Sequence, residues 1–396
     1  MTARLLLFTG KGGVGKTTLA AATAAALAAA GRKTLVVSTD PAHSLGDALD
    51  VPLTAAVTEV DAGLAAAQVD PRALVDSTWR DLRGHLRTLL AGAGVDEVDA
   101  EELTVLPGVE ELLALSEVRR LASTGPWDVV VVDCGPTAET LRLLALPEAF
   151  AGYVERLFPT HRRVVRGLLA GVAGSANVDR WDATADALGR LAEHLDGLRA
   201  LLTSTDTAVR LVMTPERVVA AETRRTVTAL ALQGVRVDGV IANRLVPDPG
   251  DDVGPAAEWL RARHREQRAV LAEWDDARTV EHHAAEPVGL PALLTVATGL
   301  YGRDDPLEPF TAPTGIPPVE VVREEGHCYA LRIPLSVGDS PLDLARVGDD
   351  LAVTVDGRRK LVALPSLLRR CVVTGAELDD AALVVRFEPD PDLWMR

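Results

Sequence analysis

The chain has 396 residues, of which 47% are apolar and 25% are charged, and its formal net charge is -16. This composition is that of a folded globular protein and excludes an intrinsically disordered chain. The negative charge argues against nucleic acid as the main partner, because binding a phosphate backbone requires a dense Lys and Arg surface. The length is sufficient for a large domain with about a hundred residues to spare, so two domains are expected.

The first part of the chain predicts neither secretion nor membrane insertion. Its apolar run, residues 5–8, is shorter than the roughly 7 to 15 residues of a signal-peptide core. The Ala-rich segment 19–30 is too short to span a bilayer. The three cysteines are widely spaced and form no CxxC pair, which argues against both zinc and a disulfide framework. We therefore expect a cytoplasmic protein without zinc.

Five short apolar runs are expected to form buried strands of a mostly parallel sheet. They are nearly continuous in Val, Leu and Ile rather than alternating, as expected when helices cover both faces of a sheet. The runs are residues 5–8, 34–38, 129–132, 211–213 and 240–241. They predict a doubly wound α/β fold, which we expect to occupy residues 1–302.

Two longer segments between these runs, about residues 55–122 and 140–205, are predicted to be helical. Both exceed what a simple crossover requires, so they are expected to form a helical subdomain. The second segment carries apolar residues at helical spacing, which fit either core packing or a groove for a hydrophobic client. These residues are Phe150, Tyr153, Leu157, Phe158, Val164, Val165, Leu168 and Leu169.

A second domain is predicted from the change in sequence pattern near residue 303. Residues 303–317 contain too many prolines for helix or sheet and are expected to be a linker. Beyond it, apolar residues alternate with others around residues 329–333, as in a half-buried strand. Asp356-Gly357 is typical of a two-residue hairpin turn. Residues 318–396 are therefore predicted to form an all-β sandwich.

Residues 10–17 fit the phosphate-loop pattern GxxxxGK(S/T) between a predicted strand and a predicted helix. Glycines allow backbone N–H groups to converge on phosphates, and the helix adds its positive N-terminal end. We expect Lys16 to reach the β- and γ-phosphates of ATP and the Thr17 hydroxyl to ligate Mg²⁺. The predicted nucleotide-binding residues here are Gly10, Lys11, Gly12, Gly13, Val14, Gly15, Lys16, Thr17 and Thr18.

Lys11 is a second cation that the general pattern does not require. It is either a solvated loop lysine or a residue that reaches a γ-phosphate in a second subunit. In the latter case it would neutralise charge that develops during phosphoryl transfer, and we count it with Lys16 and Asp40 as a catalytic candidate.

Two aspartates follow predicted strands, where open α/β sheets bind ligands. Asp133 follows residues 129–132 and is expected to hold the water shell of Mg²⁺. Asp40 follows residues 34–38 and is expected to orient the attacking water, or else to act as a helix cap or a turn residue before Pro41. His43, His282 and His283 have no partners at ligand spacing and are interpreted as surface histidines, the last two adjacent in sequence.

Together these motifs resemble the arsenical pump ATPase and tail-anchored-protein targeting ATPase family over about residues 1–300. The resemblance implies a Mg²⁺- and ATP-dependent homodimer in which Lys11 crosses to the other subunit and Asp40 belongs to switch I. It also implies that Asp133 begins switch II and that Asn243 contacts adenine. The motifs are the phosphate loop, Asp40-Pro41-Ala42-His43, Asp133 with Pro136-Thr137 and residues 140–144, and Asn243-Arg244.

A second resemblance is carried by the segments 317–319, 329–334 and 361–365. Through them, residues 318–388 resemble the α-crystallin-like, small heat-shock type domain that is appended to some members of this family. The chain departs from the family at Ala138-Glu139, where switch II usually has Gly-His, so the link from nucleotide state to the helical subdomain is in question. It also lacks the CxxC of the eukaryotic targeting factors. Its three methionines lie outside the predicted helical segments, so a Met-lined client groove is not expected.

The preferred hypothesis is an ATP-gated carrier for a hydrophobic or tail-anchored segment, with a protein client or a membrane-associated partner. The alternative is an arsenite- or antimonite-stimulated pump subunit, although a trivalent metalloid prefers about three thiolates and residues 1–302 contain only Cys134. An iron-sulfur reductase would need two cysteines from each ATPase domain, and this domain contains one, so that function is not expected. A DNA- or membrane-positioning ATPase would need a basic surface or a terminal amphipathic helix, and the sequence indicates neither.

Overall fold

The computed structural model describes residues 3–42, 44–70, 109–135, 196–310, 320–323, 328–334, 342–355, 358–378 and 382–391. The chain divides into two units, one of Met1–Thr207 with Glu286–Pro306 and the other of Ala208–Ala285 with Leu307–Arg396. The predicted fold class is confirmed: a mostly parallel sheet with helices is joined in sequence to a small antiparallel β domain.

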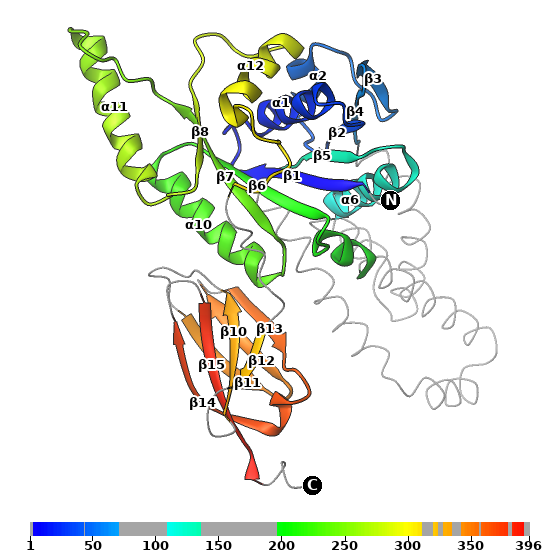
Figure 1. The fold of residues 1–396 in the computed structure, drawn as a ribbon, viewed down its shortest axis with the longest axis vertical. Helices are drawn as coiled ribbons and strands as arrows, with labels where there is room; N and C mark the ends of the chain where they lie inside the picture. Colours follow the sequence, from blue (N-terminus) through cyan, green and yellow to red (C-terminus); the bar gives the residue numbers. More distant parts are fainter. Residues whose placement is uncertain are drawn as a thin grey trace, which may run out of the picture. The chain divides into compact units, whose positions relative to one another are not determined.

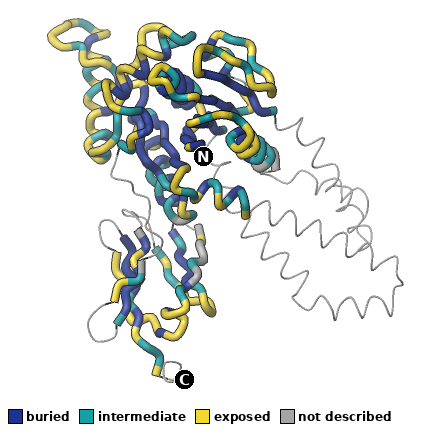
Figure 2. The backbone as a smooth tube through the Cα atoms, turned by 45° about the vertical axis from the view of Figure 1, so that its right-hand side comes forward, coloured by how far each residue is buried: buried dark blue, intermediate teal, exposed yellow. Residues whose placement is uncertain are grey.

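The main sheet has eight strands in the order β3-β4-β2-β5-β1-β6-β7-β8 (Figure 1). All five predicted runs are strands, and several extend beyond the predicted bounds. Strands β2 and β5 are buried along their whole length, which explains their continuous apolar sequences. Figure 2 shows that buried residues gather in the interior of the part of the chain that contains the main sheet. The strands are β1 (Arg4–Gly10), β2 (Thr34–Ser38), β3 (Thr58–Asp61), β4 (Leu64–Gln68), β5 (Val129–Asp133), β6 (Thr207–Met213), β7 (Val237–Leu245) and β8 (Arg278–Glu281).

Helices flank this sheet, as expected for a doubly wound fold. The connection from β1 through α1 to β2 moves toward the β3 edge of the sheet, and the connection from β4 through α6 to β5 moves toward the β8 edge. Because parallel crossovers are right-handed, the two helices are on opposite faces. The described helices are α1 (Lys16–Ala29), α2 (Ser44–Leu49), α6 (Val109–Thr124), α10 (Arg217–Leu232), α11 (Pro255–Leu271) and α12 (Leu290–Tyr301).

The prediction that residues 55–122 are helical throughout is wrong at its beginning. Strands β3 and β4 occupy part of this segment, and the Ala-rich β4 pairs in parallel with β2, Leu35 opposite Ala65. Alanine favours a helix, but pairing beside a fully buried strand overrides that propensity. Helix α6 confirms the prediction at the segment's end. Residues 71–108 and 136–195, with the apolar series from Phe150 to Leu169, lie outside the described residues.

The C-terminal strands form two antiparallel sheets, in the orders β14-β15-β10-β9 and β11-β12-β13. Residues of both sheets share one core, which includes Leu331 and Phe387 from the first sheet and Val353 from the second, and this confirms a sandwich. The predicted hairpin is also confirmed, since Val355 pairs with Arg358 across the two intervening residues. The strands are β9 (Glu320–Arg323), β10 (Tyr329–Pro334), β11 (Leu342–Val347), β12 (Asp350–Val355), β13 (Arg358–Ala363), β14 (Cys371–Leu378) and β15 (Ala382–Pro389).

The first part of the predicted linker, residues 303–310, contacts strands β6 to β8 through Phe310. The Phe310 backbone N–H donates to the Asp238 carbonyl at 2.8 Å. The Phe310 ring lies against the guanidinium groups of Arg210 and Arg278, at 4.3 and 4.4 Å from their central carbons. Arg210 also pairs with the Asp238 carboxylate at 3.1 Å, and both side chains are almost fully buried. Phe310 therefore attaches the first part of the linker to these strands.

No helix in the described part of the chain is both long and apolar enough to cross a membrane.

Candidate functional site

The phosphate-loop residues connect the end of β1 to the start of α1 through a tight turn. Gly13 and Gly15 have φ angles of +79° and +96°, a region that residues with a Cβ rarely adopt. Gly12 and Gly13 are exposed, and a Cβ added at either would meet nothing within 4 Å, so the backbone of the loop is open to an approaching group. Helix α1 has no side-chain cap and no acidic residue in its first turn. Its first N–H groups are therefore suited to bind an anion.

Lys16 is 5% exposed, and its ammonium group donates to the Lys11 carbonyl at 3.3 Å. This bond draws the side chain back along the loop, where a bound phosphate would lie. The Lys11 side chain is exposed. Its predicted reach into a second subunit is not tested by a single chain and stays a prediction.

A buried carboxylate, Asp133, lies at the centre of the site. Its Oδ2 accepts hydrogen bonds from the Thr17 hydroxyl at 2.9 Å and from the Ser38 hydroxyl at 3.0 Å. Thr17 is also 3.1 Å from the hydroxyl of Ser44. The start of α1, the ends of β2 and β5, and the start of α2 thus meet in one hydrogen-bonded group, which we call the Asp133 cluster: Thr17, Ser38, Ser44 and Asp133.

The environment of Asp133 fits a metal ion held through water. Its Oδ1 is buried and has no hydrogen-bond partner among the described residues. Burial raises the pKa of Asp133 to about 6, although the bonds from Thr17 and Ser38 favour the charged form. A hydrated Mg²⁺ would supply both the positive charge and the water donor that Oδ1 lacks, and hydroxyl and carboxylate oxygens are the donors it prefers. The residues present therefore fit the ion that the sequence implied.

Asp40 takes part in a turn in this structure. Its Oδ1 accepts a hydrogen bond from the Ala42 N–H at 3.0 Å, and its own N–H donates to Ser38 Oγ at 3.2 Å. These bonds confirm that Asp40 acts as a turn residue. The turn bond uses one carboxylate oxygen, so it is compatible with an added role in orienting water, which stays a prediction.

Asn243 lies on β7, in the other compact unit from the phosphate loop. Its side-chain oxygen accepts from the Arg244 N–H at 2.9 Å, and Arg244 has a left-handed φ of +59°. Such strain in a non-glycine residue is common at functional sites. The predicted contact with adenine stays a prediction.

The structure describes two of the three histidines considered in the sequence, and it does not describe the switch II pair Ala138-Glu139. His282 and His283 are exposed, as predicted. His43 and Ala138-Glu139 lie outside the described residues. Within the described ranges, no group of three His, Cys, Asp or Glu side chains could hold a metal ion.

Cys134 is buried beside Asp133, and burial raises its pKa far above the usual range of a thiol. A buried thiol of this kind stays protonated at neutral pH, whereas metals and metalloids bind the thiolate.

Sequence reasoning missed Ser38 and Ser44. A weak signal was present, because Ser38 ends the second buried run and Ser44 begins a helix four residues after Asp40. Their approach to Asp133 depends on the pairing of β2 with β5, which places Ser38 opposite Asp133.

Two family models match the chain. The model described as "Anion-transporting ATPase" matches residues 3–302, and the model described as "HSP20-like domain found in ArsA" matches residues 326–387. "Protein Rv2184c" of Mycobacterium tuberculosis is 40% identical, over 99% of this chain and 97% of its own length. The "Putative arsenical pump-driving ATPase" of Prosthecochloris vibrioformis is 33% identical, over 96% and 93%. The "ATPase GET3" of Chaetomium globosum is 28% identical, over 69% and 81%.

Proposed function

Since the chain belongs to the anion-transporting ATPase family and is an ATPase, we propose that it is a Mg²⁺-dependent homodimeric switch that closes on ATP to bind or deliver a hydrophobic protein segment. The membership confirms the resemblance found in the motifs, including the appended HSP20-like domain. The observation that carries the proposal is the Asp133 cluster, because it joins the phosphate loop directly to the segment around Asp40.

The Asp133 cluster supports a switch as well as a binding site. Thr17 and Asp133 would hold Mg²⁺, which when bound neutralises charge on the β- and γ-phosphates. In this structure the Thr17 hydroxyl donates to Asp133 and lies close to the hydroxyl of Ser44. Engaging Thr17 with a metal replaces at least one of these contacts. The start of α2 and the end of β2 therefore respond to the occupancy of the phosphate loop, which is what a switch segment requires.

Lys16, Lys11 and Asp40 have separate roles in the proposed turnover. Lys16 binds the β- and γ-phosphates from within the loop. Lys11, exposed at the loop surface, neutralises charge on the γ-phosphate of a second subunit. Asp40 orients the attacking water near the Asp133 cluster. Hydrolysis in this scheme is shared between two copies of the chain and is coupled to their closure.

A hydrophobic client is favoured over a metalloid by the chemistry of the cysteines. Three thiolates are the preferred ligands of a trivalent metalloid. Cys134 is buried with a strongly raised pKa, and burial also raises the pKa of Cys371. The arsenite-stimulated pump subunit remains the second candidate, because a relative that matches 96% of this chain is named a putative arsenical pump-driving ATPase.

Capture of a hydrophobic helix tests the proposal. An Asp40→Asn variant held in ATP and Mg²⁺ is coexpressed with a tagged single hydrophobic helix, and Lys16→Ala serves as the control that cannot hold the phosphates. We expect Asp40→Asn to retain the helix in ATP and Lys16→Ala to lose it. Failure of both to retain the helix, together with a several-fold rise in wild-type ATPase activity on adding arsenite, would replace this proposal with the pump function.

A further inference from the structure

The carboxyl end of β7 departs from regular strand geometry at Asn243 and Arg244. These two residues together face one residue of β8, Val280, where regular pairing would place one residue opposite each. Arg244 also has a left-handed φ of +59°, which a residue with a Cβ keeps only when its surroundings hold it there. Bulges of this kind turn side chains to new directions and are frequent beside functional sites. This bulge lies at the end of a parallel strand, where open α/β sheets bind ligands.

Gln267 of α11 bridges the backbone on both sides of Leu245. The residue is 3% exposed, its Oε1 accepts from the Val246 N–H at 2.7 Å, and its Nε2 donates to the Arg244 carbonyl at 3.2 Å. Because a backbone N–H only donates and a carbonyl only accepts, these two bonds determine the orientation of the amide. Gln267 therefore holds the chain in the path that begins with the left-handed φ of Arg244.

His264 lies one turn earlier on α11 and holds the same segment. Its Nδ1 is 2.7 Å from the Val246 carbonyl, and the Arg268 Nε donates to its Nε2 at 3.3 Å. Since a carbonyl only accepts and a guanidinium only donates, Nδ1 carries the proton and Nε2 is the acceptor. Both backbone polar groups of Val246 are thus bonded by side chains of α11. We call His264 and Gln267 the α11 clamp.

The α11 clamp also affects the side chain of Asn243. Its Oδ1 accepts from the Arg244 N–H at 2.9 Å, so the orientation of the carboxamide depends on the backbone that the clamp holds. A carboxamide both donates and accepts hydrogen bonds, which matches the N7 acceptor and the amino group of adenine. Asn243 keeps 9% of its surface exposed, and the neighbouring Arg244 is exposed. The chemistry of the strand end therefore suits an adenine base.

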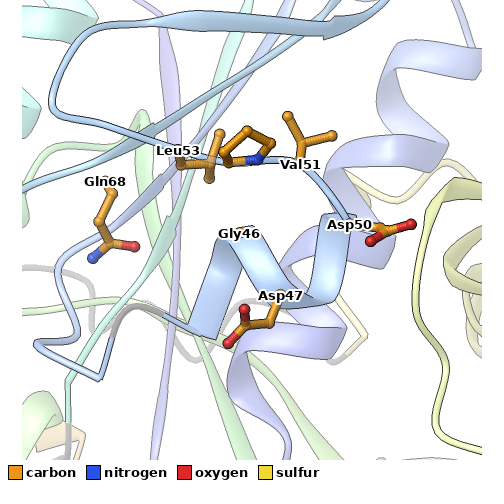
Figure 3. A pocket seen from close by; sticks show the side chains of 7 residues that line it. Gly46, Asp47, Asp50, Val51, Leu53 and Gln68 are labelled. Atoms are coloured by element: carbon orange, nitrogen blue, oxygen red, sulfur yellow. The ribbon is translucent and has the colours of Figure 1, made fainter.

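A cavity of about 290 Å³ beside α2 suits a base less well (Figure 3). The polar side chains in its lining are Asp47, Asp50 and Gln68. The Gln68 Nε2 already donates to the Asp40 carbonyl at 3.0 Å. Ionised carboxylates only accept hydrogen bonds, whereas the ring nitrogens of adenine need a donor. The end of β7 is therefore favoured over this cavity as the place that recognises the base.

We propose that Gln267 and His264 are positioning residues for recognition of the nucleotide base. This inference rests on the nucleotide binding in the proposed function and on the predicted contact of Asn243 with adenine, and it is independent of the client. Without the α11 clamp, Arg244 relaxes toward an ordinary φ and the Asn243 carboxamide turns with it. A carboxamide that is already oriented loses less freedom when the base binds, so the clamp increases affinity. Binding of the phosphates does not depend on the clamp.

Calorimetric titration of the full chain in Mg²⁺ with ADP, and separately with pyrophosphate, tests this inference, because pyrophosphate lacks the base. Gln267→Met keeps the side-chain size and removes both bonds. We expect it to raise the Kd of ADP about tenfold and that of pyrophosphate less than about twofold. His264→Phe removes only the bond to Val246 and should raise the Kd of ADP about threefold, which keeps the test available should Gln267→Met fail to fold. Asn243→Ala should also weaken ADP binding, and adding Gln267→Met to it should cause no further loss, because the clamp acts through Asn243.

Two variants serve as controls. Val270→Ala removes buried volume from α11 and should lower the urea midpoint without changing the Kd of ADP. Asp47→Asn changes the lining of the cavity beside α2 and should leave the Kd of both ligands unchanged. Equal losses of ADP and pyrophosphate binding in Gln267→Met, additive losses in the double variant, or a loss of ADP binding in either control would overturn the inference. Neither ligand has a γ-phosphate and no client is added, so failure of the proposed switch would not alter this comparison.

Discussion

The buried Arg210–Asp238 pair gives a sharp prediction about stability. The side chains are 0% and 3% exposed, and the closest atoms are 3.1 Å apart. Asp238→Ala leaves the Arg210 charge buried without its carboxylate, which typically costs about 3–5 kcal/mol. Arg210 keeps its bond to the Glu308 carbonyl and its contact with the Phe310 ring. We therefore expect the lower end of that range, about 3 kcal/mol.

Urea unfolding followed by circular dichroism and tryptophan fluorescence measures this loss. With a denaturant slope of about 3 kcal/mol per M, the midpoint should fall by about 1 M. The matched control is Asp305→Ala, which breaks the Arg32–Asp305 pair at 2.5 Å. Those side chains are 39% and 36% exposed, so this loss should stay below about 1 kcal/mol.

Equal midpoint shifts in the two variants would refute the reasoning, because burial is the difference between the pairs. A further variant separates lost packing from lost charge. The double substitution Arg210→Met with Asp238→Leu removes both charges, and we expect it to recover much of the stability that Asp238→Ala loses.

Three further predictions concern the linker, the carboxylate and the phosphate loop. Gly239→Ala places a Cβ about 2.3 Å from the Phe310 ring, so it should destabilise by about 1–3 kcal/mol in urea unfolding and be relieved by adding Phe310→Ala. Because burial raises the pKa of Asp133 to about 6, the nucleotide-free protein should lose about 3 kcal/mol of stability as pH rises from about 4 to above 6, and Asp133→Asn should abolish that loss in urea midpoints. Lys11→Ala should lower kcat about a hundredfold while changing the nucleotide Kd less than about tenfold, whereas Lys16→Ala loses both, and equal losses from Lys11→Ala would contradict catalysis in trans.

Much of the α/β core was predictable because its determinants are local. The five buried runs are strands, since continuous Val, Leu and Ile segments of this length bury well only between two helical layers. The phosphate loop was predictable from the spacing of Gly10, Gly15 and Lys16, because a turn around a phosphate tolerates few residue types. The alternation around Leu331 likewise predicted the β sandwich.

Other features depend on which segments are brought together. Residues 64–68 contain three alanines in succession and have the propensity of a helix, yet pairing with β2 makes them a strand. That strand places Gln68 beside Asp40, so that its side-chain amide donates to the Asp40 carbonyl at 3.0 Å. No spacing in the sequence links residues 28 positions apart in this way.

The amino-acid sequence by itself determined the phosphate loop, the strand positions and the two kinds of domain, because each depends on short-range patterns of side-chain size, polarity and backbone freedom. Only the tertiary structure decided that Ser38 and Ser44 join Thr17 and Asp133, that Asp40 lies in a turn, and that Arg210 pairs with Asp238 in the interior. These are contacts between strand ends and loops, set by the order and register of the sheet, which residue composition alone does not specify.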